Sequence, residues 1–573
     1  MFISYLKAVE KRWIYGAEPD LEEVTNLSKL LNINEYLAKI LVQRGIKSFD
    51  GAKEFFRPSL DKLHDPFEML NMGKAVNRLT DAIFKKEKIL IYGDYDVDGT
   101  TAVSLMYLFL SEFSDLLTFY IPDRYTEGYG ISEQGISYAH QQGFDLVIAL
   151  DCGIRAVERA EQAKSLGIDL IVCDHHLPGP VLPDAYAILD PKQKACQYPF
   201  KELSGCGVGF KLLEAFCQQN TIPKDQLFNY LDLLAISIAC DIVPIIGENR
   251  ILCHYGIKKL NKSPSTGLKS LIAVAGKKGE LNVSDIVFSL GPRINAAGRL
   301  SHAQESVKLL IGSAEKTEQY AAYLNTRNLE RREYDQHITS EALEMIAESP
   351  NDRKSTVLFK ESWHKGVIGI VASRCIEHYH RPTIILTESG GKATGSARSV
   401  DGFDVHQAIA ECSDLLDQFG GHRHAAGLSL PLDNVEEFIT RFEQVVDKNI
   451  LPDQLIPKIA LDTDISLDYV NFKTYNIISQ MAPFGPKNLA PLFGTKNVSI
   501  DSDPTILKEK HIKGFLHARE STKLFEFIGF GMAEKFSTIE LGMPFDIAYH
   551  LEENNYMGNR TLILNLKDIS FDA

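Results

Sequence analysis

The segment Ile89-Leu-Ile-Tyr-Gly-Asp-Tyr-Asp-Val-Asp-Gly-Thr-Thr-Ala102 joins a short apolar run to an apolar helical pattern through three aspartates at alternate positions. It predicts a buried parallel strand that ends, turns and opens a helix, with Asp94, Asp96 and Asp98 at the carboxyl end of the strand. Ligands bind at this edge of open α/β sheets. Because three neighbouring carboxylates repel one another, we expect a hard divalent cation among them. A polar turn in which Asp98 only caps the helix is the alternative.

The length and composition are those of an ordinary globular protein. A chain of 573 residues, 45% hydrophobic and 24% charged, should hold roughly three or four domains. Its apolar runs are all shorter than the roughly eighteen residues of a membrane span, and the first twelve residues lack the order of a signal peptide. The nine scattered cysteines include no C-x-x-C pair. We therefore expect reduced thiols in a cytoplasmic protein without a membrane segment.

The net charge of −15 argues against a broad electrostatic attraction to nucleic acid, which normally requires a basic surface. It does not exclude a local basic groove on an otherwise acidic protein. Carboxylates that hold metal ions would also count as acidic here. Composition alone therefore leaves the binding partner open.

Strand and helix patterns alternate from Lys88 to about residue 245, which predicts an α/β fold with a doubly wound parallel sheet. Helical patterns at 131–142 and 154–166 separate some of the strands. The predicted strands are 88–93, 117–122, 145–150, 169–173 and 186–189.

Three of these strands end in acids or histidines. Besides the first, one strand is followed by Asp151 and another by Asp174-His175-His176, and an apolar helix ends at Asp241 before a proline. Each has a simpler explanation, since an aspartate can cap a helix and a histidine pair can lie on the surface. Together at one sheet edge they favour a functional site. In contrast, Gly205–Gly209 lacks the Lys-Ser/Thr of a phosphate loop, so it predicts only tight packing at a helix start.

In this order, Asp-Tyr-Asp-Val-Asp-Gly, Asp-Cys-Gly, Asp-His-His and the Asp241 motif resemble the DHH phosphoesterase superfamily, and within it the bacterial single-strand-specific exonucleases. The resemblance covers nearly the whole chain. Further matching segments are Gly291–Leu300, Trp363–Arg374, Gly395–Ser399 and Gly420–Gly427. Pro483–Pro491 departs from the pattern of that family, Gly-Pro-Gly-Asn-Pro-Glu-Pro, in its middle residues, and the role of this turn stays open.

The resemblance implies two divalent cations, with Mn²⁺ preferred and Mg²⁺ as the cellular competitor. Asp96 and Asp151 would hold the first ion, with Asp94 near it. The second ion would be held by Asp98, Asp151, His175 and Asp241, so that Asp151 bridges. Tyr92 stands where some relatives have a metal-binding histidine, so water would complete the first site.

The resemblance also implies roles in catalysis and substrate binding. His176 would lie beside the scissile phosphate, and Asp94 and Asp151 would act with it in the catalytic centre. A pocket for a 5′-phosphate would use Arg124, Ser396 and Arg398, because arginine forks suit a terminal phosphate. Further candidate substrate-binding residues are Arg293, Asn295, Arg299 and His422. An arginine–carboxylate clasp is the alternative for Arg293, Asn295 and Arg299, and a glycine hairpin with incidental charges is the alternative for the segments around Ser396 and His422.

The chain beyond these motifs divides into further regions. The predicted segments are an N-terminal helical segment (1–85), the DHH catalytic domain (86–313), a long connecting helix (314–350), a smaller α/β DHH-associated domain (351–452) and an OB-like β-barrel (453–573). In the smaller α/β domain, 405–419 is predicted to be helical. The stretch Leu507–Arg519 has four Lys/Arg against one Glu and includes an aromatic residue, which is moderate support for binding of single strands by the barrel.

Three functions follow as hypotheses. The first is a 5′→3′ exonuclease that converts single-stranded DNA with a 5′-phosphate end to 5′-mononucleotides in DNA repair and recombination. The second is a DHH phosphodiesterase for small molecules or short RNAs, and the third is an inactive DHH scaffold that binds strands. The intact acids speak against the third, and the additional domains speak against the second. For the first, we expect a monomer that works with a helicase and a single-strand-binding protein.

Overall fold

The structure, a computed structural model, describes residues 11–349, 352–519, 521, 523–556 and 558–571. The chain forms two compact units. The α/β unit consists of Phe56–Arg331 with the short segment Ala482–Leu489, and the composite unit consists of Met1–Phe55, Arg332–Met481 and Ala490–Ala573. The predicted division into five segments stays a prediction. Most of the first twelve residues, which were predicted not to form a signal peptide, lie outside the described residues.

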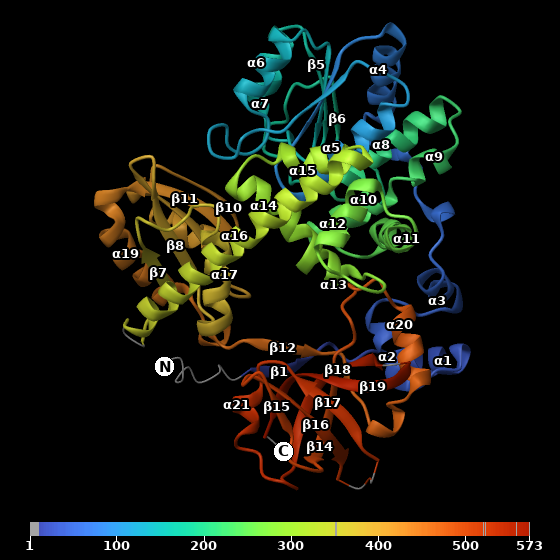
Figure 1. The fold of residues 1–573 in the computed structure, drawn as a ribbon, viewed down its shortest axis with the longest axis vertical. Coiled ribbons are helices and arrows are strands. Elements are labelled where there is room, and N and C mark those ends of the chain that lie inside the picture. Colours follow the sequence, from blue (N-terminus) through green and yellow to red (C-terminus); the bar gives the residue numbers. More distant parts are fainter. Residues whose placement is uncertain (1–10, 350–351, 520, 522, 557, 572–573) are drawn as a thin grey trace. The chain divides into compact units, whose positions relative to one another are not determined.

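The α/β unit is built on a five-stranded sheet in which all strands are parallel (Figure 1). The order is β3-β2-β4-β5-β6, so the chain moves to one side of β2 first and then to the other. This reversal creates a switch point between β2 and β4, where ligands bind in such sheets. The strands are β2 (Ile89–Gly93), β3 (Leu117–Tyr120), β4 (Leu146–Leu150), β5 (Asp169–Cys173) and β6 (Ala187–Leu189).

Helices cover both faces of this sheet, because successive side chains of each buried strand point to opposite sides. Ile89 and Ile91 of β2 belong to one core with α4, α5, α8 and α10, whereas Leu90 and Tyr92 belong to another with α6 and α7. The fold class predicted from the alternation of strands and helices is confirmed. The helices are α4 (Met72–Lys85), α5 (Val97–Leu110), α6 (Glu133–Gln141), α7 (Val157–Ser165), α8 (Gly205–Gln219) and α10 (Leu231–Cys240).

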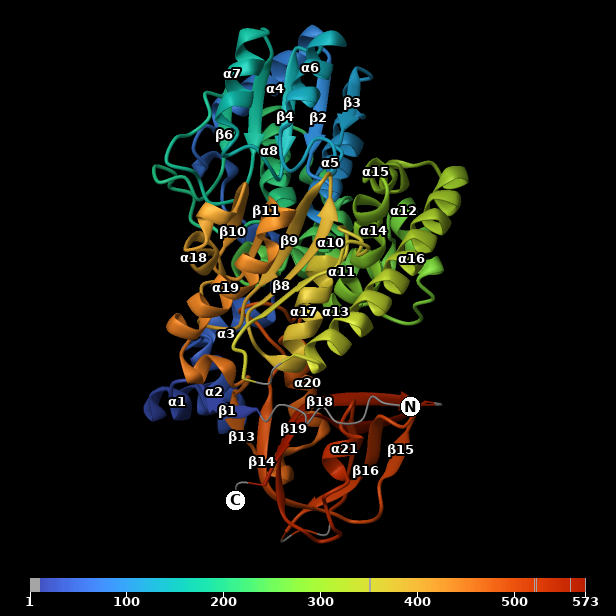
Figure 2. The same ribbon diagram turned by 90° about the vertical axis from the view of Figure 1, so that its left-hand side faces the viewer.

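The rest of the α/β unit is helical. Short helices follow α10, and one of them, η3 (Ile286–Leu290), is a π-helix that runs directly into α14. The long predicted helix is present as α16 (Ala314–Ala347) and passes from one unit into the other (Figure 2). The further helices of this unit are α9 (Lys224–Phe228), α11 (Gly247–Lys262), α12 (Thr266–Val274), α13 (Val283–Asp285), α14 (Gly291–Leu300) and α15 (Gln304–Ile311). Helix α3 (Phe49–Phe56) belongs to the composite unit except for its last residue.

The composite unit contains a mixed five-stranded sheet of order β10-β11-β9-β8-β7 (Figure 2). Only β7 and β8 run parallel to each other. Helix α17 packs with one face, and α18 and α19 pack with the other. The elements are β7 (Thr356–Phe359), α17 (Ile368–Tyr379), β8 (Thr383–Ser389), β9 (Lys392–Arg398), α18 (Val405–Ala410), β10 (Gln418–His422), β11 (Ala425–Pro431) and α19 (Val435–Asn449).

The helix expected over 405–419 is shorter than predicted. Helix α18 ends at Ala410, a 3₁₀ turn covers Ser413–Leu415, and strand β10 begins at Gln418. The apolar spacing continues past the end of the helix because Cys412 and Leu415 still face the same core. Pairing of Phe419 with Leu428 across the strands then overrides the helical pattern.

A closed barrel forms the C-terminal part of the composite unit. Strand β14 pairs with both β18 and β16, which closes a ring through β19 and β17. The predicted OB-like barrel is therefore confirmed. The strands are β13 (Thr463–Asp464), β14 (Phe493–Ile500), β15 (Thr505–Leu507), β16 (His511–Ala518), β17 (Phe525–Gly529), β18 (Phe545–Tyr556) and β19 (Asn559–Ser570), with helices α20 (Phe472–Gln480) and α21 (Ala533–Phe536).

The N-terminal segment belongs partly to this same unit and is not purely helical. Strand β1 (Arg12–Tyr15) pairs in parallel with β12 (Lys458–Leu461). Helices α1 (Leu21–Leu31) and α2 (Glu35–Gln43) follow, as predicted. The strand was not expected, because its partner lies more than 400 residues away in the sequence and a single four-residue strand has little periodicity.

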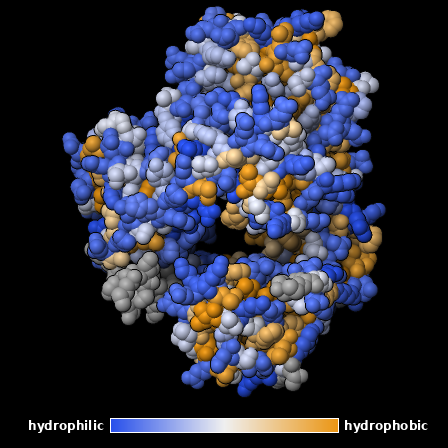
Figure 3. Space-filling model, in the orientation of Figure 1, coloured by the Kyte–Doolittle hydropathy of each residue, from blue (hydrophilic) through white to orange (hydrophobic). Residues whose placement is uncertain are grey.

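The surface of one face of the molecule is mostly hydrophilic, with hydrophobic side chains in scattered patches (Figure 3). Throughout the described ranges, no helix combines the length and the apolar character needed to cross a membrane. All nine cysteines are free, and most are buried.

Candidate metal centre

The acidic strand ends meet at the switch point of the parallel sheet. Asp94 and Asp96 follow β2, Asp151 follows β4, and Asp174-His175-His176 follows β5. Asp241 ends helix α10. The structure brings three sets of side chains within metal-binding distance of one another, with all candidate ligand atoms of a set within 4.8 Å. These sets are Asp94, Asp96 and Asp151; Asp98, His175 and Asp241; and Asp151, His175 and His176.

The three aspartates after β2 make different contacts. Asp96 caps helix α5, because its Oδ1 accepts hydrogen bonds from the main-chain N–H groups of Asp98 and Gly99 at 2.8 and 3.1 Å. The helix cap expected for Asp98 therefore belongs to Asp96. Gly99 is required here, since a side chain would place its Cβ 2.4 Å from the carbonyl oxygen of Asp94.

Asp98 is held by a second helix. Its two oxygens accept hydrogen bonds from the N–H groups of Gly205 and Cys206, at 2.6 and 2.9 Å, where helix α8 begins. The Ser237 hydroxyl on α10 donates a third bond at 2.6 Å. The positive end of a helix dipole suits a carboxylate, so the start of α8 holds Asp98 in place.

The main chain of Asp151 has an unusual conformation, and Gly205 at the start of α8 leaves room for it. Its φ is +60°, in the left-handed region that costs most residues energy. A Cβ on Gly205 would lie 2.5 Å from the Asp151 Cβ, so only glycine permits this approach. The predicted tight packing at Gly205 is thus present, and the same helix start also binds Asp98.

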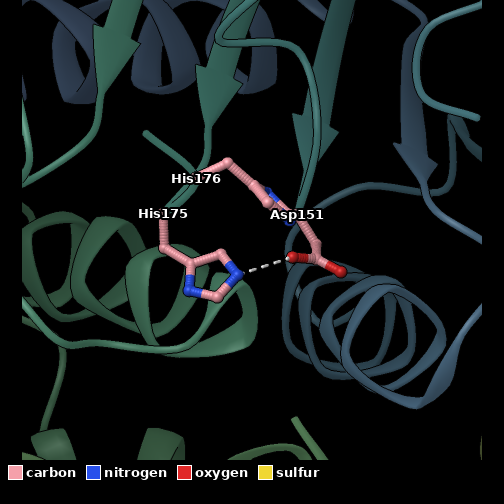
Figure 4. Close-up of side chains that lie close together, drawn as sticks. All are labelled: Asp151, His175 and His176. Atoms are coloured by element: carbon pink, nitrogen blue, oxygen red, sulfur yellow. Dashed lines mark ion pairs between the residues drawn. The ribbon is translucent and has the colours of Figure 1, made fainter. Parts of the chain in front are cut away.

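His175 points its free nitrogen at the acids (Figure 4). The Nδ1 atom donates to the Leu203 carbonyl at 3.0 Å, which leaves a lone pair on Nε2 in the neutral ring. Nε2 lies 3.3 Å from Asp151 Oδ1, 3.5 Å from Asp241 Oδ2 and 3.9 Å from Asp98 Oδ2. Burial lowers the pKa of His175, which keeps the ring neutral.

The donor atoms of this arrangement suit a cation. Both oxygens of Asp94, Oδ1 of Asp151 and Nε2 of His175 are buried, and among the described residues they have no hydrogen-bond partner. Burial raises the pKa of Asp94 and Asp151 well above the ordinary range, and it raises the pKa of Asp241 to about 9. Unpaired buried acceptors are costly, and carboxylate and imidazole donors suit divalent metals. The residues therefore fit divalent cations.

His176 is held at both ring nitrogens. Asp174 Oδ1 accepts from its Nδ1 at 2.7 Å, and the Tyr129 hydroxyl lies 3.1 Å from its Nε2. Burial by itself would raise the pKa of Asp174 and lower the pKa of His176. The pairing of the two side chains outweighs burial, so the pKa of Asp174 is lowered to about 2 and the pKa of His176 is raised. Asp174 thus orients His176. In contrast, Nε2 of His175 points toward the metal-ligand aspartates.

Tyr92 lies away from the acids. Its hydroxyl donates to the Gly130 carbonyl at 3.0 Å and accepts from the Ser132 N–H at 3.1 Å. Its ring stacks on Tyr120 in the core beside α6. The side chain that replaces the histidine of some relatives is therefore a core residue here.

The candidate substrate-binding residues of the α/β unit fall into two groups. Arg124 lies over the ring of Tyr95, and both Arg124 and Arg299 act electrostatically on Tyr95 beside the acids. The Nε of Arg293 donates a hydrogen bond to Oδ1 of Asn325 on α16, at 2.9 Å. This partner is an amide, and the carboxylate clasp stays open as the alternative for Arg293. Asn295 is half-buried on α14.

The candidates of the composite unit share one face of its sheet. Ser396 and Arg398 alternate with buried Gly395 and Ala397 on β9, and Arg398 Nη1 donates to Ser396 Oγ at 3.1 Å. Arg398 and His422 are both in register with Ala425, so they stand in one row across three strands. A Cβ on Gly369, at the start of α17, would lie 2.9 Å from Ser396 Oγ. This face offers donors and a helix start.

Sequence reasoning missed the groups that support the ligands. Tyr129, Ser237 and the N–H groups at Gly205 and Cys206 act through contacts between segments far apart in the chain. Only Ser237 carried a signal, because it lies one helical turn before Asp241 on the same apolar helix.

Three segments match known families. Residues 88–238 match the DHH family, N-terminal domain; residues 352–448 match the DHHA1 domain; and residues 461–568 match the RecJ OB domain.

The chain is also similar to named proteins over nearly its full length. It is 37% identical to the single-stranded-DNA-specific exonuclease RecJ of Bacillus subtilis (strain 168), over 98% of this chain and 71% of that protein. It is 32% identical to the exonuclease of the same name from Salmonella typhimurium, over 93% and 95%. The crystal structure of RecJ in complex with Mn²⁺ from Thermus thermophilus matches with a TM-score of 0.85 and 25% identity, over 98% of this chain and 80% of that one. A Mg²⁺ complex from the same organism shares the fold, with a TM-score of 0.79, 24% identity, and coverage of 98% and 79%.

Proposed function

The chain belongs to the RecJ family of single-stranded-DNA-specific exonucleases, and we therefore propose that it hydrolyses single-stranded DNA from the 5′ end to 5′-mononucleotides, in DNA repair and recombination. The observation that carries the proposal is the set of buried acceptors on Asp94, Asp151 and His175 at one edge of the sheet, which lack hydrogen-bond partners among the described residues. A phosphodiester hydrolase needs such a cation site beside its scissile bond.

Two divalent cations are proposed, with Mn²⁺ preferred and Mg²⁺ as the alternative. Asp94, Asp96 and Asp151 would hold one. The other would be held by Asp98, Asp151, His175 and Asp241. Bound there, such ions activate a water and neutralise phosphate charge. The neutral ring of His175 leaves Nε2 available as a ligand, and hydrogen bonds already hold the Asp98 carboxylate in place.

His176 is proposed to act on the phosphate. Its Nδ1 proton is fixed by Asp174, so Nε2 is the atom free to gain or lose a proton. The raised pKa of His176 favours the protonated ring, in which Nε2–H can donate to a phosphate oxygen or to the departing oxygen. Tyr129 keeps that nitrogen oriented when no substrate is bound.

Substrate binding is proposed for both units. On the composite unit, Ser396 and Arg398 would bind the terminal 5′-phosphate, and His422 would lie on the same strand face. On the α/β unit, Arg124 and Arg299 would offset phosphate charge near the acids, with Arg293 and Asn295 farther along α14.

The barrel is proposed to hold the strand beyond the cleavage site. Strand β16 carries Lys513 and the exposed Phe515, a cation and an aromatic face of the kind that stacks on bases. A single-strand enzyme needs its duplex opened, so a helicase and a single-strand-binding protein are the proposed partners of a monomer. The free cysteines support a cytoplasmic location.

One assay tests the proposed reaction. Purified full-length protein with Mn²⁺ is given a long single strand labelled at either end, the matching duplex, and a cyclic dinucleotide. Loss of label from the 5′ end of the single strand is expected first, with the other two substrates left intact. Equal degradation of the duplex would contradict single-strand specificity. Cleavage of the dinucleotide alone would favour a small-molecule enzyme, and no cleavage at all would favour a scaffold.

A further inference from the structure

Asp241 is one of the candidate metal ligands whose carboxylate lacks supporting donors among the described residues, and Asp94 is another. Within the described part of the chain, no N–H or hydroxyl donates to the Asp241 carboxylate, and its near polar neighbour is His175 Nε2. Asp98, in contrast, accepts three hydrogen bonds. The position of the Asp241 carboxylate therefore depends on the main chain that carries it.

That main chain leaves α10 through a strained loop. The N–H of Asp241 donates to the Ser237 carbonyl at 2.9 Å, which ends the helix. Ile242 has a φ of +60° and an exposed side chain. A β-branched residue in the left-handed region is strained and persists only where neighbouring residues are anchored. The anchors must therefore lie just beyond Ile242.

Two contacts anchor the loop. The Pro244 carbonyl accepts a bond from Asn249 Nδ2 at 3.1 Å. The Ile245 N–H donates to the Pro486 carbonyl at 2.8 Å, and the Ile245 side chain is fully buried. Pro486 belongs to the segment Ala482–Leu489, called here the strap, which is part of the α/β unit although the chain on either side of it belongs to the composite unit.

The strap is a small, tightly bonded structure. Gly485 and Asn488 exchange both main-chain hydrogen bonds, at 3.0 and 2.9 Å. The buried Asn488 side chain donates to the Pro483 carbonyl at 2.8 Å, and Arg250 of α11 donates to the Ala482 carbonyl at 3.0 Å. Gly485 lies directly on Ile245, where an added Cβ would come within 2.4 Å of Cδ1 and 2.9 Å of Cγ1.

We infer that the strap is a positioning element of the metal centre, which holds Asp241 toward His175 through Pro486, Gly485 and Ile245. This inference rests on the proposed metal-dependent function. It gives a role to the turn that departs from the pattern of its family. None of the candidate metal ligands or substrate-binding residues lies in the strap. Its Pro486 and Gly485 contact Ile245, so we expect it to act through the loop at 242–246.

Binding of Mn²⁺ to the full-length protein tests the inference without any nuclease assay. Gly485→Ala should push Ile245 away and weaken Mn²⁺ binding about 10–100-fold, the usual loss when a supporting group of a ligand is removed. Binding is measured by titration calorimetry or by the electron paramagnetic resonance signal of free Mn²⁺. The matched control is Gly73→Ala on α4, which meets no atom within 4 Å and should leave binding unchanged.

A double-mutant cycle separates positioning from general loss of structure. If the strap acts through Asp241, Gly485→Ala should cause no further loss of Mn²⁺ affinity in an Asp241→Ala background. Losses that add in the double variant, or wild-type affinity in Gly485→Ala, would overturn the inference. Asn488→Ala, which loosens the strap without a clash, replaces Gly485→Ala in the cycle if that variant does not fold. Failure of the wild-type protein to bind Mn²⁺ would instead contradict the proposed function.

Discussion

The metal centre of the α/β unit and the strand face around Arg398 in the composite unit are both proposed to meet phosphate, yet they are built from opposite charges. The first is a buried group of carboxylates with unpaired acceptors. The second carries Ser396, Arg398 and His422 on accessible strands, with a helix start beside them. Acids can bind phosphate only through cations, whereas arginine and serine bind it directly. Metal dependence and end recognition should therefore be separable by mutation.

Asp151→Ala should have the largest effect. It removes the ligand proposed to be shared by both ions, so turnover should fall at least about a thousandfold while binding of single strands persists. Rates are measured with Mn²⁺ on a 5′-phosphorylated strand, and binding by fluorescence anisotropy. Asp184→Ala, an exposed carboxylate paired with Lys164, is the control. A variant that keeps a tenth of the wild-type rate would disprove the shared role.

Ser237→Ala should come next, because it removes one of the three donors to Asp98. We expect Mn²⁺ affinity to fall about 10–100-fold, as when supporting partners of metal ligands are removed. The Mn²⁺ concentration for half-maximal activity and direct titration both report it. Ser104→Ala removes a buried hydroxyl of α5 that bonds only to the Thr100 carbonyl and should leave the affinity unchanged. An equal loss in both variants would mean that Ser237 is only structural.

Arg398→Ala should affect the other region alone. The preference for a 5′-phosphorylated over a 5′-hydroxyl end should fall about tenfold, the size of one charge-assisted hydrogen bond. Mn²⁺ affinity should not change. Competition between the two substrates measures the preference, and Lys392→Ala, at the other end of β9, is the control. Weaker Mn²⁺ binding in Arg398→Ala would break the separation of the two regions.

The smallest effect concerns pH and the stability of the metal-free protein. Aspartates whose pKa is raised in the folded state bind more protons than in the unfolded state, so stability is lost as pH rises from about 4 toward the folded value, about 9 for Asp241. The melting temperature of the metal-free protein should therefore be about 1–2 °C lower at pH 8 than at pH 6 for each kcal/mol lost. Added Mn²⁺ should abolish this difference. If the melting temperature of the metal-free protein is the same at pH 6 and pH 8, burial does not raise the pKa of these aspartates in the folded state.

Local sequence patterns were enough to predict the sheet and the ends of its strands, because apolar runs of strand length are followed directly by Asp94, Asp151 or Asp174. The alternation of apolar and polar residues at 525–530 and 560–566 likewise predicts β structure, which an OB-like barrel fits. Periodicity misjudged 405–419, where a core face continues past the end of a helix into β10.

The support of the site, in contrast, depends on tertiary contacts. The helix start on Asp98, the hydroxyl of Tyr129 on His176 and the strap on Ile245 are all contacts between segments far apart in the chain. The type of a side chain tells which atoms it can offer to a metal. Which of those atoms remain unpaired depends on distant donors, and these are placed only when the chain folds.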